Sequence, residues 1–226
     1  MNFLPYTIYD NFLRNPDTIK NWALTLNYTS PPVPIFPGKR TECLSKINPS
    51  FFHHYNSKIL SLFFSNDVNY EFNAITQFHL SKDIEEKGWI HQDPAIFTAL
   101  LYLSDEDPNV NRGTSLYEMK PDVVPGEANF DFLNSIKYEQ YGTGKIDKEK
   151  NKIKEDYENN NFNKILDIKD KYNRIFCFDS SGEIFHSSNN HSSPSSKERL
   201  TLITFINEVR TNEMFPIVKS RRQSNL

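Results

Sequence analysis

Residues 96–104 read Ile-Phe-Thr-Ala-Leu-Leu-Tyr-Leu-Ser, and this short apolar run constrains the fold more than any other part of the chain. A strand that lacks alternation of apolar and polar side chains is typically buried on both faces. Such a strand needs a layer of structure on each side. The run therefore predicts a sheet in the interior of a layered domain.

The spacing of apolar residues predicts helices before residue 70 and strands after it. Helical spacing follows residue 15 and recurs at residues 49–65. Strands are expected at residues 3–9, 70–80, 89–93, 96–104, 114–119, 174–179, 183–186 and 199–208. This order predicts an α+β, mainly β fold, a β-sandwich or open barrel with the N-terminal helices packed on one sheet.

Residues 120–172 interrupt the strand pattern, and their charge-rich composition predicts an inserted, partly helical, solvated segment. Within it, the run 145–171 is expected to be a solvated face, with a lid over a site as the alternative. With 226 residues, a single domain is the default. Its expected parts are a helical support at 1–69, a β core at 70–210 that contains the insert 120–172, and a C-terminal tail at 211–226.

Composition excludes several classes of function. The net charge of −3 argues against nucleic acid as the main partner. The two cysteines, Cys43 and Cys177, form no Cys-x-x-Cys pair, which argues against thiolate zinc and redox motifs. The N-terminus lacks a secretory signal pattern, and no apolar stretch reaches the length of a membrane span. We therefore expect a cytoplasmic protein with no membrane partner.

His91 and Asp93 form a His-x-Asp pair in the run Gly-Trp-Ile-His-Gln-Asp-Pro. On a strand, residues two apart point to the same face. Two such ligands and a second histidine would make the 2-His-1-carboxylate triad of non-haem Fe(II) oxygenases. Alone, the pair occurs often by chance, so its weight depends on the rest of the chain.

Two further residues complete a recognisable order along the chain. His186 ends an expected strand, and Arg199 begins the next one. The order of His-x-Asp, distal His and basic residue resembles the Fe(II)/2-oxoglutarate-dependent dioxygenases. Their fold is the double-stranded β-helix (jelly roll). Residues 101–104, 112–117 and 173–186 look closest to the prolyl 4-hydroxylase-like group, and the resemblance covers roughly residues 70–210.

The resemblance implies a catalytic centre and an activity. The implied catalytic residues and metal ligands are His91, Asp93 and His186. Arg199 would bind the C5 carboxylate of 2-oxoglutarate, because a guanidinium can give a carboxylate two parallel hydrogen bonds. Tyr102 would donate a hydroxyl to the same carboxylate, or be a core tyrosine. Thr201 shares a strand face with Arg199 and would line the pocket or simply pack.

The implied reaction is hydroxylation of a C–H bond with release of succinate and CO2. Its cofactors are Fe(II), 2-oxoglutarate as cosubstrate and O2, with ascorbate as a further candidate. The substrate would be a protein or peptide side chain or a small molecule. The alternatives are a catalytically inactive jelly-roll binding module and a cupin-like metal enzyme that does not use 2-oxoglutarate.

Several assignments remain open at this stage. His191 lies closer to Arg199 than His186 does and competes for the role of distal ligand, but a strand end positions a ligand better than a loop. Gln77 and His79 share a strand face and are either site residues or structural hydrogen-bonding residues. The turn at residues 36–40 either places a basic residue near the mouth of the site or is an exposed turn.

Overall fold

The computed structural model describes residues 6–64, 69–81, 88–105, 112–121, 130–145, 147–180, 182, 184–189 and 198–211. The N-terminal part contains β1 (Tyr6–Tyr9), α1 (Pro16–Leu24), β2 (Lys39–Arg40), α2 (Leu44–Ile47) and α3 (Pro49–Leu60). The middle contains β3 (Tyr70–Ser81), β4 (Phe97–Tyr102), β5 (Gly113–Met119), α4 (Phe130–Thr143) and α5 (Lys148–Asn161). The last strands are β6 (Phe162–Lys169), β7 (Ile175–Asp179), β8 (Ile184–Ser188) and β9 (Arg199–Thr211).

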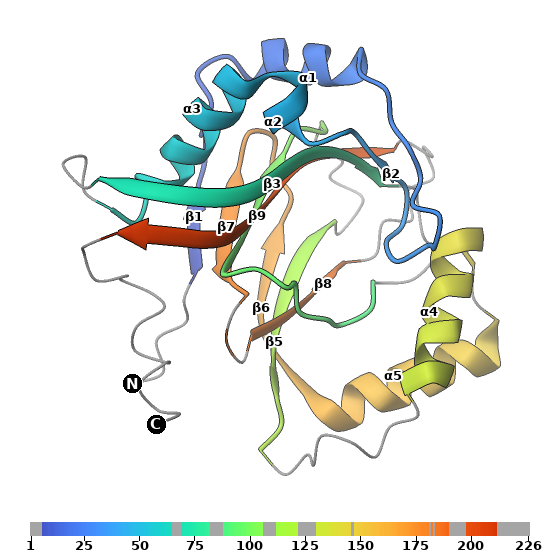
Figure 1. The fold of residues 1–226 in the computed structure, drawn as a ribbon. Helices are drawn as coiled ribbons and strands as arrows, with labels where there is room; N and C mark the ends of the chain where they lie inside the picture. Colours follow the sequence, from blue (N-terminus) through green and yellow to red (C-terminus); the bar gives the residue numbers. More distant parts are fainter. Residues whose placement is uncertain are drawn as a thin grey trace.

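The described strands form two antiparallel sheets (Figure 1). A six-stranded sheet has the order β1-β7-β4-β9-β3-β2, and a three-stranded sheet has the order β6-β5-β8. The longest ladder joins β3 to β9, from Tyr70 opposite Thr211 to Ser81 opposite Arg199. Helices α1, α2 and α3 cover one face of the larger sheet, and α4 and α5 lie beside the smaller sheet (Figure 1).

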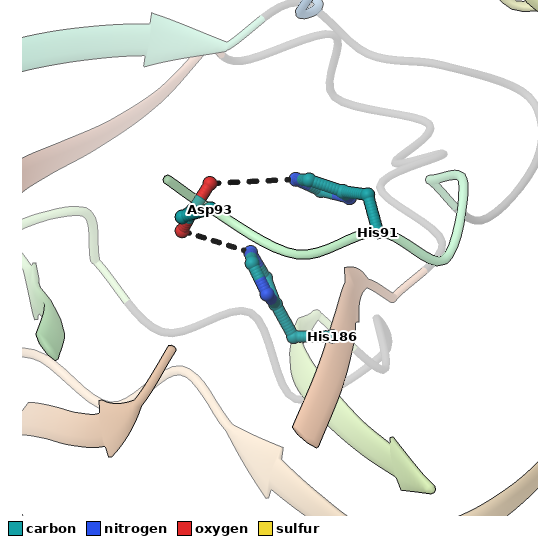
Figure 2. A group of neighbouring side chains, drawn as sticks. All are labelled: His91, Asp93 and His186. Carbon is teal, nitrogen blue, oxygen red and sulfur yellow. Dashed lines mark ion pairs between the residues drawn. The ribbon is translucent and has the colours of Figure 1, made fainter. Parts of the chain in front are cut away.

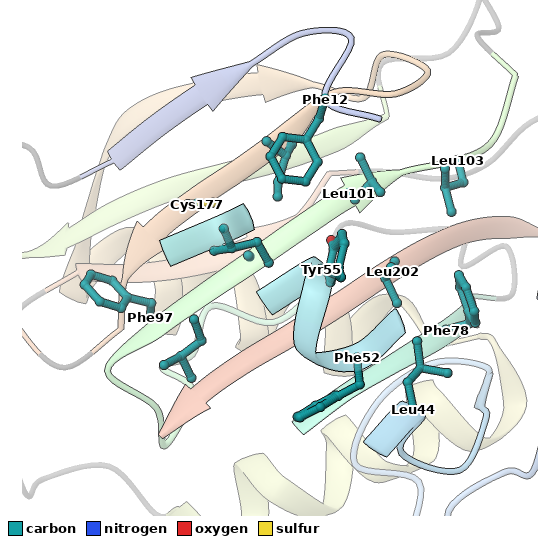
Figure 3. Packing of buried hydrophobic residues seen from close by; sticks show 14 of the residues in the cluster. Phe12, Leu44, Phe52, Tyr55, Phe78, Phe97, Leu101, Leu103, Cys177 and Leu202 are labelled. Atoms are coloured by element: carbon teal, nitrogen blue, oxygen red, sulfur yellow. The ribbon is translucent and has the colours of Figure 1, made fainter. Parts of the chain in front are cut away.

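The main core lies between the N-terminal helices and the six-stranded sheet (Figure 3). Phe52 and Tyr55 of α3 pack there with Phe78 of β3 and with Leu101 and Leu202 of the central strands. Asn48 caps α3 by accepting a hydrogen bond from the Phe51 amide, and Pro49 occupies the first turn, where its missing N–H costs nothing. The mixed helix and antiparallel-sheet class, with helices on one sheet, is confirmed.

A second core lies between the two sheets. Leu100 and Tyr102 of β4 pack there with Leu116 of β5, while Leu101 between them faces the helices. Every residue of β4 is buried, so the prediction of a strand covered on both faces is confirmed. Burial at this level makes truncation of one Leu cost about 2–5 kcal/mol.

Two sequence predictions of local structure differ from the observed fold. Residues 89–93 form no regular strand; only His91 pairs, in an isolated bridge with His186, because the segment meets the rim of the smaller sheet and then reaches Pro94. The end of the segment 120–172 is also different, since Phe162–Lys169 forms β6 and pairs with β5. Its alternation is masked by exposed Lys and Asp side chains, which are common on an edge strand.

Helices α4 and α5 confirm the helical character of the segment 120–172, but they are less solvated than expected. Leu133 and Ile136 pack against Trp89, and Lys154 and Glu158 of the charge-rich α5 are buried. Among the described helices, none combines the length and apolar character that a membrane crossing needs.

Candidate metal centre

Two backbone hydrogen bonds bring His91 and His186 together from distant parts of the chain. The His91 amide donates to the His186 carbonyl at 3.0 Å, and the His186 amide donates back at 2.8 Å. The two imidazole centroids are 4.3 Å apart. Three residues before His91, the Gly88 amide donates to the Ser188 carbonyl at 2.8 Å. The bridge thus holds the His91 segment to β8 although that segment is no regular strand.

His91, Asp93 and His186, from here on the triad, point their polar atoms at one place (Figure 2). Asp93 Oδ1 lies 3.8 Å from His91 Nε2, and Asp93 Oδ2 lies 3.3 Å from His186 Nε2. One possible ligand atom from each residue lies within 4.8 Å of the others, a group that could hold a metal ion. The side chains of Asp93 and His186 are 11% and 10% exposed and that of His91 is 36% exposed, so the triad opens to solvent beside His91.

Neighbouring groups fix the orientation of the triad. The Thr98 hydroxyl donates to Asp93 Oδ2 at 2.7 Å and accepts from the Ser180 hydroxyl at 2.7 Å. His91 Nδ1 lies 2.8 Å from the Trp89 carbonyl, which accepts only, so this nitrogen carries the proton and leaves the Nε2 lone pair free. Hydrogen bonds of this kind orient metal ligands in known metal sites.

Electrostatics favour the protonation states that a metal ion needs. Burial, together with the neighbouring His186, lowers the pKa of His91 to about 3. Burial also lowers the pKa of His186. For Asp93, burial acts to raise the pKa, but His186, His91, the Thr98 hydrogen bond and Arg40 outweigh it, so the pKa is lowered. At neutral pH the triad is therefore two neutral imidazoles and one carboxylate.

A pocket beside the triad also contains two arginines. It is lined by the triad, by Arg199 of β9 and Arg40 of β2, and by apolar side chains of β4, β9 and the loop at 35–37, and it measures about 90 Å³. On the same measure a single water needs about 10–15 Å³. The pocket therefore has room for an organic molecule, and of the two alternatives for the turn at residues 36–40 the structure favours a basic residue near the site, Arg40.

Arg199 is buried at the start of β9. Its Nη1 donates to the Gly113 carbonyl at 3.3 Å, and its Nε has no hydrogen-bond partner among the described residues. Burial lowers the Arg199 pKa, and the neighbouring Tyr102 and Asp170 counteract that effect. The guanidinium carbon lies 5.8 Å from the centroid of the Tyr102 ring. Arg199 therefore has free donor capacity in a dry environment.

Tyr102 and Thr201 are cross-strand neighbours next to Arg199. The Tyr102 hydroxyl donates to the Thr114 hydroxyl at 2.9 Å, and the buried Thr201 Oγ1 has no partner in the described part of the chain. Neither residue is among those that line the pocket. Arg199, Tyr102 and Thr201 are thus brought together, with Arg199 alone of the three reaching the pocket.

The remaining candidates are distributed as follows. Gln77 donates to the Thr41 carbonyl at 2.7 Å, a structural hydrogen bond. His79 lines the pocket, but its Nε2 contacts the Pro37 carbonyl at 2.7 Å and burial lowers its pKa to about 3, so it is neutral. His191 lies outside the described residues.

Sequence reasoning missed several residues of the pocket wall, among them Tyr141 of α4. Its hydroxyl accepts a hydrogen bond from the Trp89 amide at 3.1 Å, and the Trp89 indole donates to Gln140 at 2.6 Å. The helical segment therefore holds the chain just before His91. No local sequence signal pairs an aromatic on this helix with residue 89.

Comparison with known proteins places these features in a family and a fold. The model of the family described as "Family of unknown function (DUF6445)" matches residues 3–206. No curated protein sequence matches the chain.

Several solved structures are similar in fold, and two serve as examples. One is a prolyl hydroxylase from Trichoplax adhaerens in complex with a hypoxia inducible factor oxygen degradation domain peptide fragment, with a TM-score of 0.50 and 13% identity. The alignment covers 91% of this chain and 84% of that one. The other is HygX from Streptomyces hygroscopicus with nickel and 2-oxoglutarate bound, with a TM-score of 0.52 and 8% identity, covering 90% and 83% of the two chains. At such identities the likeness is one of fold.

Proposed function

The chain belongs to DUF6445, a family of unknown function, and from its site we propose that it is an Fe(II)- and 2-oxoglutarate-dependent dioxygenase that hydroxylates a C–H bond. One observation carries this proposal. Two imidazole Nε2 atoms and a carboxylate converge in a pocket that also receives the buried guanidinium of Arg199. The fold of a 2-oxoglutarate-binding protein, HygX, supports it.

The donor set of the triad fits Fe(II). Two imidazoles and one carboxylate are the protein ligands of the 2-His-1-carboxylate facial triad, which leaves coordination positions open for other molecules. The polar groups around the triad also fit, because Thr98 orients Asp93 and the Trp89 carbonyl orients His91. We propose His91, Asp93 and His186 as the metal ligands.

The strand order supports the double-stranded β-helix as the finer description of the fold. A jelly roll has two facing antiparallel sheets. Here β3, β9, β4 and β7 are consecutive in one sheet, β6, β5 and β8 form the other, and the His91–His186 bridge adds the His91 segment beside β8. The triad then lies at the rim of the space between the sheets.

The chain's own residues would perform the following tasks. Arg199 would bind the C5 carboxylate of 2-oxoglutarate with parallel hydrogen bonds, and Tyr102 and Thr201 would shape the polar end of that site. Leu100 and Ile203 line the pocket and would exclude water. When bound, Fe(II) supplies the redox chemistry that couples O2 to oxidation of the substrate, with succinate and CO2 as coproducts.

The substrate is proposed only as a class. The Trichoplax adhaerens structure holds a peptide fragment, which supports a protein or peptide side chain as one candidate. A small molecule is the other candidate, because apolar side chains such as Leu100 and Phe205 line a pocket of about 90 Å³.

Succinate formation tests the proposal. Purified protein would be incubated with Fe(II), ascorbate, O2 and 2-oxoglutarate, together with panels of peptides and free amino acids. We expect succinate in the wild type and none from Asp93→Ala, with an unchanged far-ultraviolet circular dichroism spectrum. Binding of 2-oxoglutarate that is unaffected by Arg199→Ala would favour a cupin-like enzyme, and absence of metal binding would favour a non-enzymatic module.

A further inference from the structure

Arg40 is the second cationic side chain of the site pocket, and the proposed chemistry does not use it. It lies on β2, the edge strand of the six-stranded sheet, opposite His79 of β3. Its backbone is fixed by reciprocal hydrogen bonds with Thr29 of 3.0 and 2.9 Å. The strand therefore holds this residue at a defined place beside the triad.

Aromatic rings hold the Arg40 guanidinium. Its central carbon lies 3.7 Å from the centroid of the Phe36 ring and 5.4 Å from that of Phe205. Stacking of this kind orients the plane of the guanidinium and leaves its N–H edge available. Over the described residues, the side chain makes no hydrogen bond and no ion pair, and its Nε is buried without a partner.

Among the described residues, the Asp93 carboxylate is the one anionic group that acts on the Arg40 charge, and it forms no ion pair with it. Burial lowers the pKa of Arg40 to about 10, and the nearby Asp93 carboxylate counteracts that effect, so the side chain is charged at neutral pH. A metal ion on Asp93 would neutralise the carboxylate that faces Arg40. An unpaired, partly buried cation is costly, and an anionic ligand offsets that cost.

The cosubstrate does not account for Arg40. Of the two carboxylates of 2-oxoglutarate, one would lie at the metal and the other at Arg199, which is buried beside Tyr102 and Gly113. Arg40 instead lies among Ile35, Phe36 and Phe205 on the pocket wall. The pocket thus offers a separate cation next to an apolar surface.

We propose that Arg40 binds an acidic group of the substrate that this protein oxidises. The substrate is then an organic anion, with an apolar part against Phe36 and Phe205 and a carboxylate or phosphate on the guanidinium. This assignment rests on the proposed function, since it places the substrate that is hydroxylated beside an Fe(II)/2-oxoglutarate centre. Lys137 of α4 also interacts electrostatically with the Asp93 carboxylate, so it adds positive charge to the same region.

Ligand-observed NMR tests this assignment by binding. The protein would be loaded with Mn(II) and saturated with 2-oxoglutarate, and titrated with 3-phenylpropionate, 3-phenylpropyl phosphate and the neutral 3-phenylpropanamide. Broadening of the probe signals by paramagnetic Mn(II) reports binding next to the metal. We expect at least one anionic probe to bind about tenfold more tightly than the amide, a difference of about 1.4 kcal/mol.

Two substitutions at position 40 and one matched control make the test specific. Arg40→Met should remove the preference for the anions, and Arg40→Lys should keep part of it, because the charge remains but the two-pronged geometry is lost. Lys39→Met is the control. Lys39 is adjacent on the strand, faces the other way and pairs with Glu198 at 3.7 Å, so its loss should leave the preference intact.

Equal affinity for the anions and the amide would overturn the proposal. A preference for the anions that survives Arg40→Met would also overturn it, and so would binding of the anions without paramagnetic broadening. Loss of 2-oxoglutarate binding in Arg40→Met would overturn it too, because Arg40 would then be the residue that binds the cosubstrate. Failure of the wild type to bind 2-oxoglutarate, measured by calorimetry, would instead refute the proposed function. The affinities of the three probes would then be compared on the Mn(II)-loaded protein without 2-oxoglutarate.

Discussion

Thr98→Val isolates the contribution of one hydrogen bond to the metal site. Thr98 donates to Asp93 Oδ2, the oxygen that faces His186, and valine keeps the branched shape while removing the hydroxyl. Asp93 then loses the group that fixes its rotation, and a carboxylate that samples other orientations binds a metal less tightly. We expect the substitution to weaken metal binding while leaving all three ligands in place.

The magnitude follows from the two hydrogen bonds of this hydroxyl. Loss of an orienting partner costs about 10–100-fold in metal affinity, which is about 1.4–2.8 kcal/mol. The Ser180 hydroxyl also loses its acceptor, and a buried unpaired hydroxyl lowers the free energy of unfolding by about 1–3 kcal/mol. The double variant Thr98→Val, Ser180→Ala should recover part of the stability but none of the metal affinity.

Calorimetric titration of Mn(II) into the metal-free protein measures the first effect, and urea unfolding measures the second. Thr76→Val is the matched control. Among the described residues, the Thr76 hydroxyl bonds to Asn56 and Thr204 and to no member of the triad. The Thr76→Val variant should have a lower free energy of unfolding and an unchanged affinity for Mn(II). The reasoning is refuted if Thr98→Val binds Mn(II) like the wild type, or if Thr76→Val loses the same affinity.

Three further expectations concern other parts of the site. Gly88→Ala should weaken metal binding and lower the thermal midpoint, because an added Cβ would clash with Ser188 Oγ and crowd the Ser188 backbone nitrogen at 3.2 Å; unchanged values in both assays would contradict this. His79 has a folded pKa of about 3, below its unfolded value, so its contribution to stability is lost as pH falls from about 6.5 toward 3, by about 2 kcal/mol at pH 5. Between pH 7 and pH 5, urea unfolding should show a smaller loss of unfolding free energy in His79→Gln than in the wild type. An equal loss in the two proteins would contradict this expectation. Arg199→Met should raise the Kd of 2-oxoglutarate about 100-fold and leave Mn(II) affinity unchanged, whereas Arg174→Met, which removes a surface pair with Asp10, should change neither.

Periodicity and composition recovered the long strands β3 and β9 and the buried strand β4. The burial of β4 followed from its composition, and β3 and β9 were predicted within a few residues of their ends. Strand β6 was missed because its exposed Lys and Asp side chains resemble a solvated segment. Its strand character comes from pairing with β5, which is a tertiary contact.

The candidate site was predicted in part. The resemblance to the dioxygenases implied His91, Asp93 and His186 as ligands, and the structure brings their polar atoms together, although His91 is held by a single bridge and not by the expected strand. Tyr141 was not predictable, since its place depends on how α4 packs against Trp89. The roles of the site residues and the division of the chain into parts remain predictions.

The visible absorption band of an iron-bound 2-oxoacid tests the central claim most directly. Under anaerobic conditions, Fe(II) and 2-oxoglutarate added to the wild-type protein should produce this band. Asp93→Ala and His186→Ala should lack it, and His191→Ala should retain it. Absence of the band in the wild type, or its loss in His191→Ala with retention in His186→Ala, would contradict the proposed centre.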